Sequence, residues 1–145
     1  MRRLLLLAAL VLGGCSPGLG VDAYPTEPGT QVDCKALFAD SPQTVAGEDA
    51  ILVDGDNAIA WGAPPIILRC GVEKPAGLTK ISACYPVADV DWFAETIADG
   101  YLFTTVGRRF YVSVEVPETY DPASDALADV ADAVKKHDPP VEPCV

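Results

Sequence analysis

Apolar and polar residues alternate most regularly in residues 110–116. Phe110, Val112, Val114 and Val116 take one side of the pattern, and Tyr111, Ser113 and Glu115 take the other. A period of two is typical of a strand with one buried face. Residues 101–106 predict its antiparallel partner, with a hairpin turn at Gly107 and Arg108.

The other strand candidates are shorter, and they lie at residues 50–53, 58–61, 66–70, 84–87 and 90–93. The last two predict a second hairpin that turns at Ala88 and Asp89. In the third candidate, Cys70 falls on the apolar face and Arg69 on the opposite face. We therefore expect an antiparallel sheet of about five strands.

Two amphipathic helices are predicted, one before and one after this sheet. Thr30 and Asp33 form a helix start pattern, and Pro42 ends the first helix. Cys34 lies on the apolar face of this helix. In the second helix, Asp121 is the expected N-cap before Pro122. Its apolar stripe consists of Leu127, Val130, Ala131 and Val134, and Lys135, Lys136 and His137 close it.

Narrow helical stripes and a sheet with one apolar face can bury each other. The predicted fold class is therefore α+β, with two layers. An antiparallel sheet of about five strands is packed by an N-terminal and a C-terminal helix.

The N-terminus resembles an export signal. Arg2 and Arg3 precede the apolar residues 4–12, and a bilayer-spanning helix would need about 20 such residues. The run Leu-Gly-Gly-Cys that ends at Cys15 is typical of a lipoprotein processing site. We expect residues 1–14 to be a signal peptide and Cys15 to be lipidated. The protein would then be exported and anchored in the lipid bilayer, on the outer face of the cytoplasmic membrane.

The rest of the chain divides by composition. Residues 15–29 are rich in proline and glycine and predict a flexible tether after the lipidated cysteine. Residues 30–138 form the predicted α+β domain. Residues 139–145 form a proline-rich tail that a disulfide would pin.

Charge and composition exclude several functions. The chain has 21 acidic and 10 basic residues and a net charge of −11, so its field opposes nucleic-acid binding. The single histidine, His137, lies at a helix end, and the sequence has no G-x-S-x-G motif that would supply a nucleophilic serine for a hydrolase triad. The polar residues 54–57 lack the further positions of a calcium loop. We expect no catalytic centre, no metal site and no cofactor.

Four cysteines remain beside Cys15, an even number that fits disulfides in an oxidising compartment. Cys34 and Cys70 both lie on predicted apolar faces, which favours a bond between them. Elimination then pairs Cys84 with Cys144. The alternative connectivity joins Cys70 to Cys84 and Cys34 to Cys144, and spacing leaves it open.

Three blocks carry a resemblance to a known family, and they read AWGAPPIILRCGV at residues 60–72, VDWF at 90–93 and YLFTTVGR at 101–108. They resemble short exported actinobacterial proteins that are catalogued only as a domain of unknown function. The resemblance covers residues 30–136 and implies a secreted or lipid-anchored envelope protein with no assigned activity. It also implies that Cys34 and Cys70 are the family's usual pair.

The candidate contact residues are arginines and tryptophans. Arg69, Arg108 and Arg109 suit carboxylate partners, although internal salt bridges are the ordinary use of such residues. The turn at Gly107 is expected to project Arg108 and Arg109 beyond the sheet, so reversing both charges should spare the fold. We therefore expect a non-enzymatic module that contacts another envelope protein or a cell-wall component.

The alternative function is a small-ligand-binding lipoprotein. It would use a surface formed by Trp61 and Trp92, although packing is the commoner role for tryptophan in a small domain.

Overall fold

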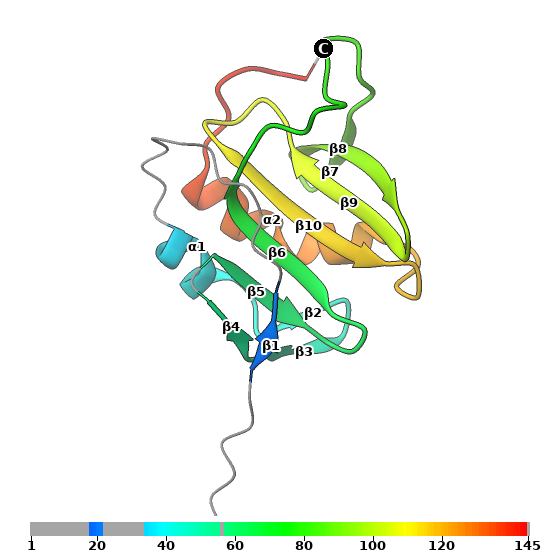
Figure 1. The fold of residues 1–145 in the computed structure, drawn as a ribbon. Helices are drawn as coiled ribbons and strands as arrows, with labels where there is room; N and C mark the ends of the chain where they lie inside the picture. The colour runs from blue at the N-terminus through cyan, green and yellow to red at the C-terminus, as the bar shows by residue number, and fades with distance from the viewer. Residues whose placement is uncertain (1–17, 22–33, 56, 145) are drawn as a thin grey trace, which may run out of the picture.

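The computed structural model describes residues 18–21, 34–55 and 57–144. One antiparallel sheet of eight strands dominates it, in the order β2-β3-β5-β6-β10-β9-β8-β7 (Figure 1). Its strands are β2 (Thr44–Val45), β3 (Glu48–Ile51), β5 (Ala58–Trp61), β6 (Ile66–Val72), β7 (Tyr85–Val87), β8 (Val90–Ile97), β9 (Gly100–Thr105) and β10 (Tyr111–Pro117). A small parallel sheet pairs β1 (Leu19–Gly20) with β4 (Val53–Asp54).

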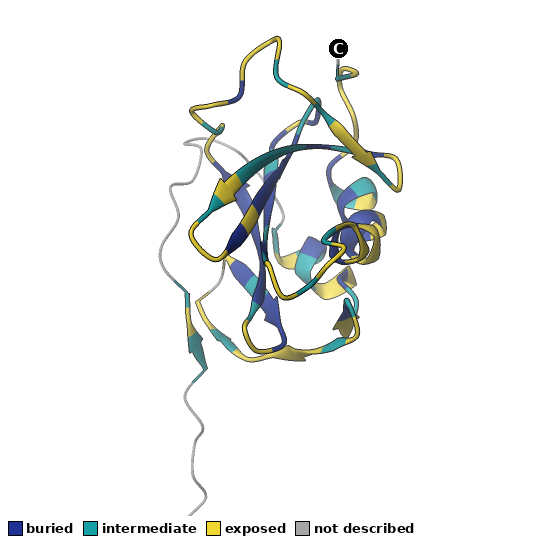
Figure 2. Ribbon diagram, turned by 90° about the vertical axis from the view of Figure 1, so that its right-hand side faces the viewer, coloured by how far each residue is buried: buried dark blue, intermediate teal, exposed yellow. Residues whose placement is uncertain are grey.

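Two helices, α1 (Cys34–Asp40) and α2 (Ser124–His137), complete the described fold. The predicted stripe of α2 is buried at Leu127, Val130, Ala131 and Val134. It packs with Val112, Val114 and Val116 of β10, so the alternation in that strand does mark the core side. Figure 2 shows the buried side of α2 turned toward the central strands.

The expectation of five strands in two layers is wrong in detail. The protein is mostly β, and β6 is buried at all seven positions, on both of its faces. On the face away from α2, Ala58, Ala60 and Ile67 form a second cluster that Leu19 and Val53 pack against. The segment that contains β1 therefore covers part of the back of the sheet.

This packing also changes the predicted tether of residues 15–29. The Leu19 N–H donates to the Leu52 carbonyl oxygen at 2.7 Å, and Leu19 is in register with Val53 of β4. Leu19 packs against apolar residues although it lies in a proline-rich segment, so at least residues 18–21 belong to the folded body. The predicted signal peptide, Cys15 and the start of the first helix lie outside the described residues.

Both predicted hairpins are present. β7 and β8 turn at Ala88 and Asp89, which both have positive φ, and β9 pairs with β10. The predicted N-cap at Asp121 is wrong, because the backbone N–H of Asp125 donates to the Pro122 carbonyl oxygen in a separate turn. The helix therefore starts at Ser124, and no side chain caps it.

The structure confirms the predicted disulfides. Cys34 of α1 is bonded to Cys70 of β6, and Cys84 is bonded to Cys144 in the tail. The first bond fastens α1 to the sheet beside the core. No helix in the described part of the chain is long and apolar enough to cross a membrane.

Candidate functional site

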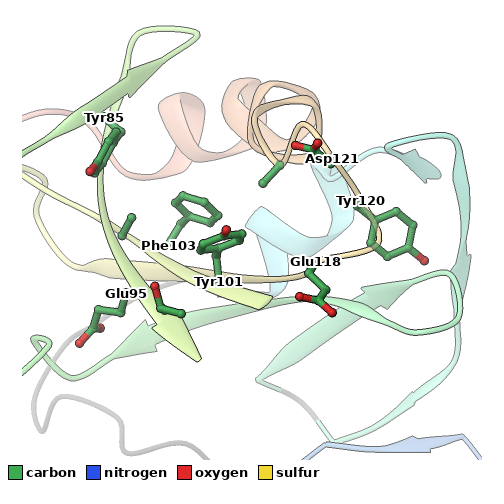
Figure 3. Close-up of a pocket in the computed structure, with 10 residues that line it drawn as sticks. Tyr85, Glu95, Tyr101, Phe103, Glu118, Tyr120 and Asp121 are labelled. Atoms are coloured by element: carbon green, nitrogen blue, oxygen red, sulfur yellow. The ribbon is translucent and has the colours of Figure 1, made fainter. Parts of the chain in front are cut away.

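The candidate site is an open groove of about 610 Å³ at the end of the sheet near the start of α2. Strands β7, β8 and β9 supply one side, and the connection from β10 to α2 supplies the other. The lining residues are Tyr85, Ala94, Glu95, Thr96, Tyr101, Phe103, Glu118, Tyr120, Asp121 and Ala123 (Figure 3). The groove forms just before the start of α2, where the helix does not cover the sheet.

Aromatic rings form the middle of the groove. Tyr101 and Phe103 are two residues apart on β9, so both point to the α2 side of the sheet. Their ring centroids are 6.1 Å apart, and the rings are tilted by 42°. Tyr101 is 43% exposed and Tyr85 is 53% exposed, which leaves two aromatic faces open to a ligand.

The charged groups of the groove are acidic. Glu118 and Asp121 line it from the connection between β10 and α2, whereas Glu95 lies at its edge with its carboxylate on the other face of β8, beside Gly77 and Phe93. None of the described lining residues is a lysine, arginine or histidine. The Tyr120 hydroxyl donates to the Pro64 carbonyl oxygen at 2.7 Å, which fixes that ring at the rim. Burial, and then the nearby carboxylate of Glu48, raise the pKa of Tyr120.

This set of side chains favours a particular ligand chemistry. Aromatic faces attract cations through their ring quadrupole and also offer flat apolar surface. Carboxylates add direct charge attraction to an amine or a guanidinium. The groove is therefore suited to a polar ligand that has a positive charge.

The structure does not provide the tryptophan surface of the alternative function, and both rings have the packing role that is commoner for tryptophan. Trp61 is 1% exposed and Trp92 is 0% exposed, and both lie in the main core cluster. The indole N–H of Trp61 donates to the Pro42 carbonyl oxygen at 2.9 Å. Both rings face the helices through the alternation of their strands, so neither is available to a ligand.

The expected exposure of Arg108 is also wrong. Arg108 is only 9% exposed, because the tail folds over the turn at Gly107. Its guanidinium donates to the carbonyl oxygen of Asp138 and, at 3.0 Å, to that of Asp89. Burial lowers the pKa of Arg108. The side chain holds two turns and the tail together.

The other two arginines lie in different surroundings. Arg69 is 6% exposed, and its guanidinium lies 2.9 Å from Glu115 on the adjacent β10, in an internal salt bridge. Arg109 is exposed. The structure therefore does not bring the three arginines together as one contact surface.

Asp138 is a buried carboxyl beside Arg108. Its Oδ1 accepts the backbone N–H groups of Arg109 at 3.0 Å and Phe110 at 3.3 Å. Its Oδ2 has no hydrogen-bond partner among the described residues. Burial raises the pKa of Asp138 to about 6, against the opposing effect of these N–H groups and Arg108.

This raised pKa predicts an unusual pH dependence of stability. The folded state binds the Asp138 proton more tightly than the unfolded state, so this group stabilises the fold as pH falls from about 6 toward 3.8. The difference corresponds to roughly 3 kcal/mol at most. Asp138→Asn keeps an acceptor oxygen, so it should gain stability over the parent at pH 7.5 and lose that advantage at pH 4. Urea unfolding of both proteins across this range measures the effect, and a constant difference would contradict it.

His137 is a structural residue at the end of α2. Its Nε2 lies 2.6 Å from Asp40 Oδ2, and Lys136 lies 2.7 Å from the same oxygen. These hydrogen bonds, first from Lys136 and then from His137, lower the pKa of Asp40. Ser113 faces the other side of the sheet by the alternation of β10, and Ser124 begins α2. The structure therefore does not bring His137 to either serine.

The residues that line the groove were not among those predicted from the sequence. Tyr101 and Phe103 did carry a sign, because two aromatic residues two apart on a strand must share one face. Glu118, Tyr120 and Asp121 carried no such sign, because their place depends on where α2 begins.

Comparison with known proteins identifies a protein family. The family model described as "Protein of unknown function (DUF3515)" matches residues 4–143. The matched range includes Cys15 and every residue that lines the groove. No curated protein and no solved structure matches the chain.

Proposed function

The chain belongs to DUF3515, a family of unknown function, and from its groove we propose that it is a non-enzymatic binding module of the cell envelope. It is exported and held on the outer face of the cytoplasmic membrane by acyl chains on Cys15. It contacts another envelope protein or a cell-wall component. An actinobacterial source is part of the same proposal.

The observation that carries this proposal is the open groove with its two exposed tyrosines. Tyr101 and Tyr85 remain exposed although the domain buries two tryptophans and most of its other aromatic area. Tyrosine is enriched at recognition surfaces because it offers large contact area and a hydroxyl at low entropic cost. The acidic lining then selects against anionic partners.

The sequence supports the anchoring part of the proposal. A short basic start, an apolar run of nine residues and small residues before Cys15 are typical of lipoprotein precursors. An acidic domain is repelled by anionic lipid, so covalent chains would be needed to hold it at the surface.

One experiment in cells tests both parts. A photoreactive residue in place of Tyr101 should capture an envelope neighbour, whereas the same residue in place of Ala128, exposed on α2, should not. Adding Cys15→Ala should abolish lipid labelling, release the chain from the membrane fraction and reduce capture.

Equal capture from positions 101 and 128 would show that the groove is not the contact site. Unchanged membrane retention of the Cys15→Ala chain would show that something else anchors it.

A further inference from the structure

Strand β8 extends beyond its edge neighbour β7. The register of the two strands ends at the pair Tyr85 and Trp92, whereas β8 continues to Ile97. Among the residues that the structure describes, β9 is the one strand that pairs with residues 93–97 of β8. One side of this stretch is therefore an open sheet edge, and open edges accept additional strands.

Hydrogen-bond alternation identifies the groups that this edge presents. The Val106 N–H donates to the Asp91 carbonyl oxygen at 2.8 Å, so the odd-numbered residues of β8 bond toward β9. The closing pair Ile97 and Gly100 has the same parity. The backbone N–H and C=O groups of Ala94 and Thr96 therefore point outward, along the line that β7 would follow if it were longer.

The path of the chain explains why β7 begins only at Tyr85. The preceding residue, Cys84, is bonded to Cys144 in the tail. The tail in turn is fastened to the turn at Gly107, whose carbonyl oxygen accepts the N–H groups of Val141 and Glu142. The chain before Tyr85 is therefore held toward the tail and does not continue along β8.

The open edge borders the groove. Ala94 and Thr96 line it, and they share a face with Tyr101 and Phe103 through their register on β9. Alternate side chains of a strand added at this edge would point toward the groove. Glu118 and Asp121 on the opposite side would face them.

We propose that this edge binds an extended peptide segment of a protein partner, as a short strand added to β8 with a lysine or arginine directed into the groove. The inference rests on the proposed function and names the partner chemistry of the same site. Backbone hydrogen bonds at Ala94 and Thr96 supply affinity, as in other complexes formed by strand addition. The carboxylates and the ring of Tyr101 supply the preference for a basic side chain. Pairing with a second copy of this chain would instead bring two acidic grooves together.

The test uses the full chain purified in detergent and a displayed library of random heptapeptides. Peptides that contain lysine or arginine should be enriched. Thr96→Pro removes an N–H that faces away from β9, and it should weaken the selected peptides at least about tenfold. Thr96→Val keeps that N–H and should bind within about twofold of the parent, which makes it the matched control.

A second measurement does not depend on the proline variant folding. Single N-methyl groups along a selected peptide should weaken binding at every second position, because only alternate N–H groups face β8. Uniform sensitivity along the peptide, or enrichment of acidic peptides, would overturn the inference. Self-association that Thr96→Pro abolishes would also overturn it.

Two further outcomes separate this inference from the proposed function. If the chain bound soluble peptidoglycan fragments and no peptide were enriched, the inference of peptide binding at β8 would be wrong. The proposed function would remain supported. Failure of the position 101 capture would remove the proposed function itself.

Discussion

The Arg108→Glu variant is expected to lose about 3–5 kcal/mol of folding free energy, because it leaves a carboxylate in a buried site. The guanidinium of Arg108 donates to carbonyl oxygens at Asp138 and Asp89, and a glutamate can donate to neither when ionised. The new charge would also lie near the buried carboxyl of Asp138. Denaturant unfolding followed by circular dichroism measures the loss.

The adjacent Arg109 supplies the control. It is exposed, so Arg109→Glu should change stability by no more than about 0.5 kcal/mol. Equal effects of the two variants would contradict the assignment of Arg108 as a buried support for the tail. This contrast replaces the expectation that both charges could be reversed without harm.

Trp92→Ala is expected to cost about 3–5 kcal/mol, the range for removing a large aromatic side chain from a core. Trp92 is 0% exposed and lies in the main core cluster with Val90 and Phe103. Thermal and urea unfolding both report the change. A loss below about 1 kcal/mol would indicate that the ring lies in a surface, as the ligand-binding alternative required.

Tyr85→Ala is the matched control for this substitution. Tyr85 is the register partner of Trp92 on the neighbouring strand and shares its face, but it is 53% exposed. It should change stability by less than about 1 kcal/mol. Its substitution should instead reduce capture of a partner at the groove.

Local pattern was sufficient for much of the fold. The alternation in residues 110–116 identified the buried face of β10, because a strand that packs on one side has no other solution. The apolar positions of Cys34 and Cys70 also led to the correct disulfide, because both faces meet the same core.

Long-range contacts account for what the sequence did not reveal. Arg108 donates to the carbonyl oxygen of Asp138, 30 residues further along the chain at the end of α2, and no local pattern contains that contact. Leu19 lies in a proline-rich segment, and its apolar partners come from β4 and β5. The groove combines three segments, and its shape depends on the place where α2 starts.

The pairing of β1 with β4 bears on how the protein would search for partners. A flexible tether gives a domain a local concentration set by the statistics of a polymer. Here four residue steps separate Cys15 from Leu19, a reach of at most about 14 Å at full extension. With the acyl chains proposed on Cys15, the folded body would contact neighbouring molecules chiefly by rotating about its lipid anchor. The groove lies four strands from β5 across the sheet, roughly 19 Å away, so the width of the folded sheet, and not a long linker, would set its distance from the anchor.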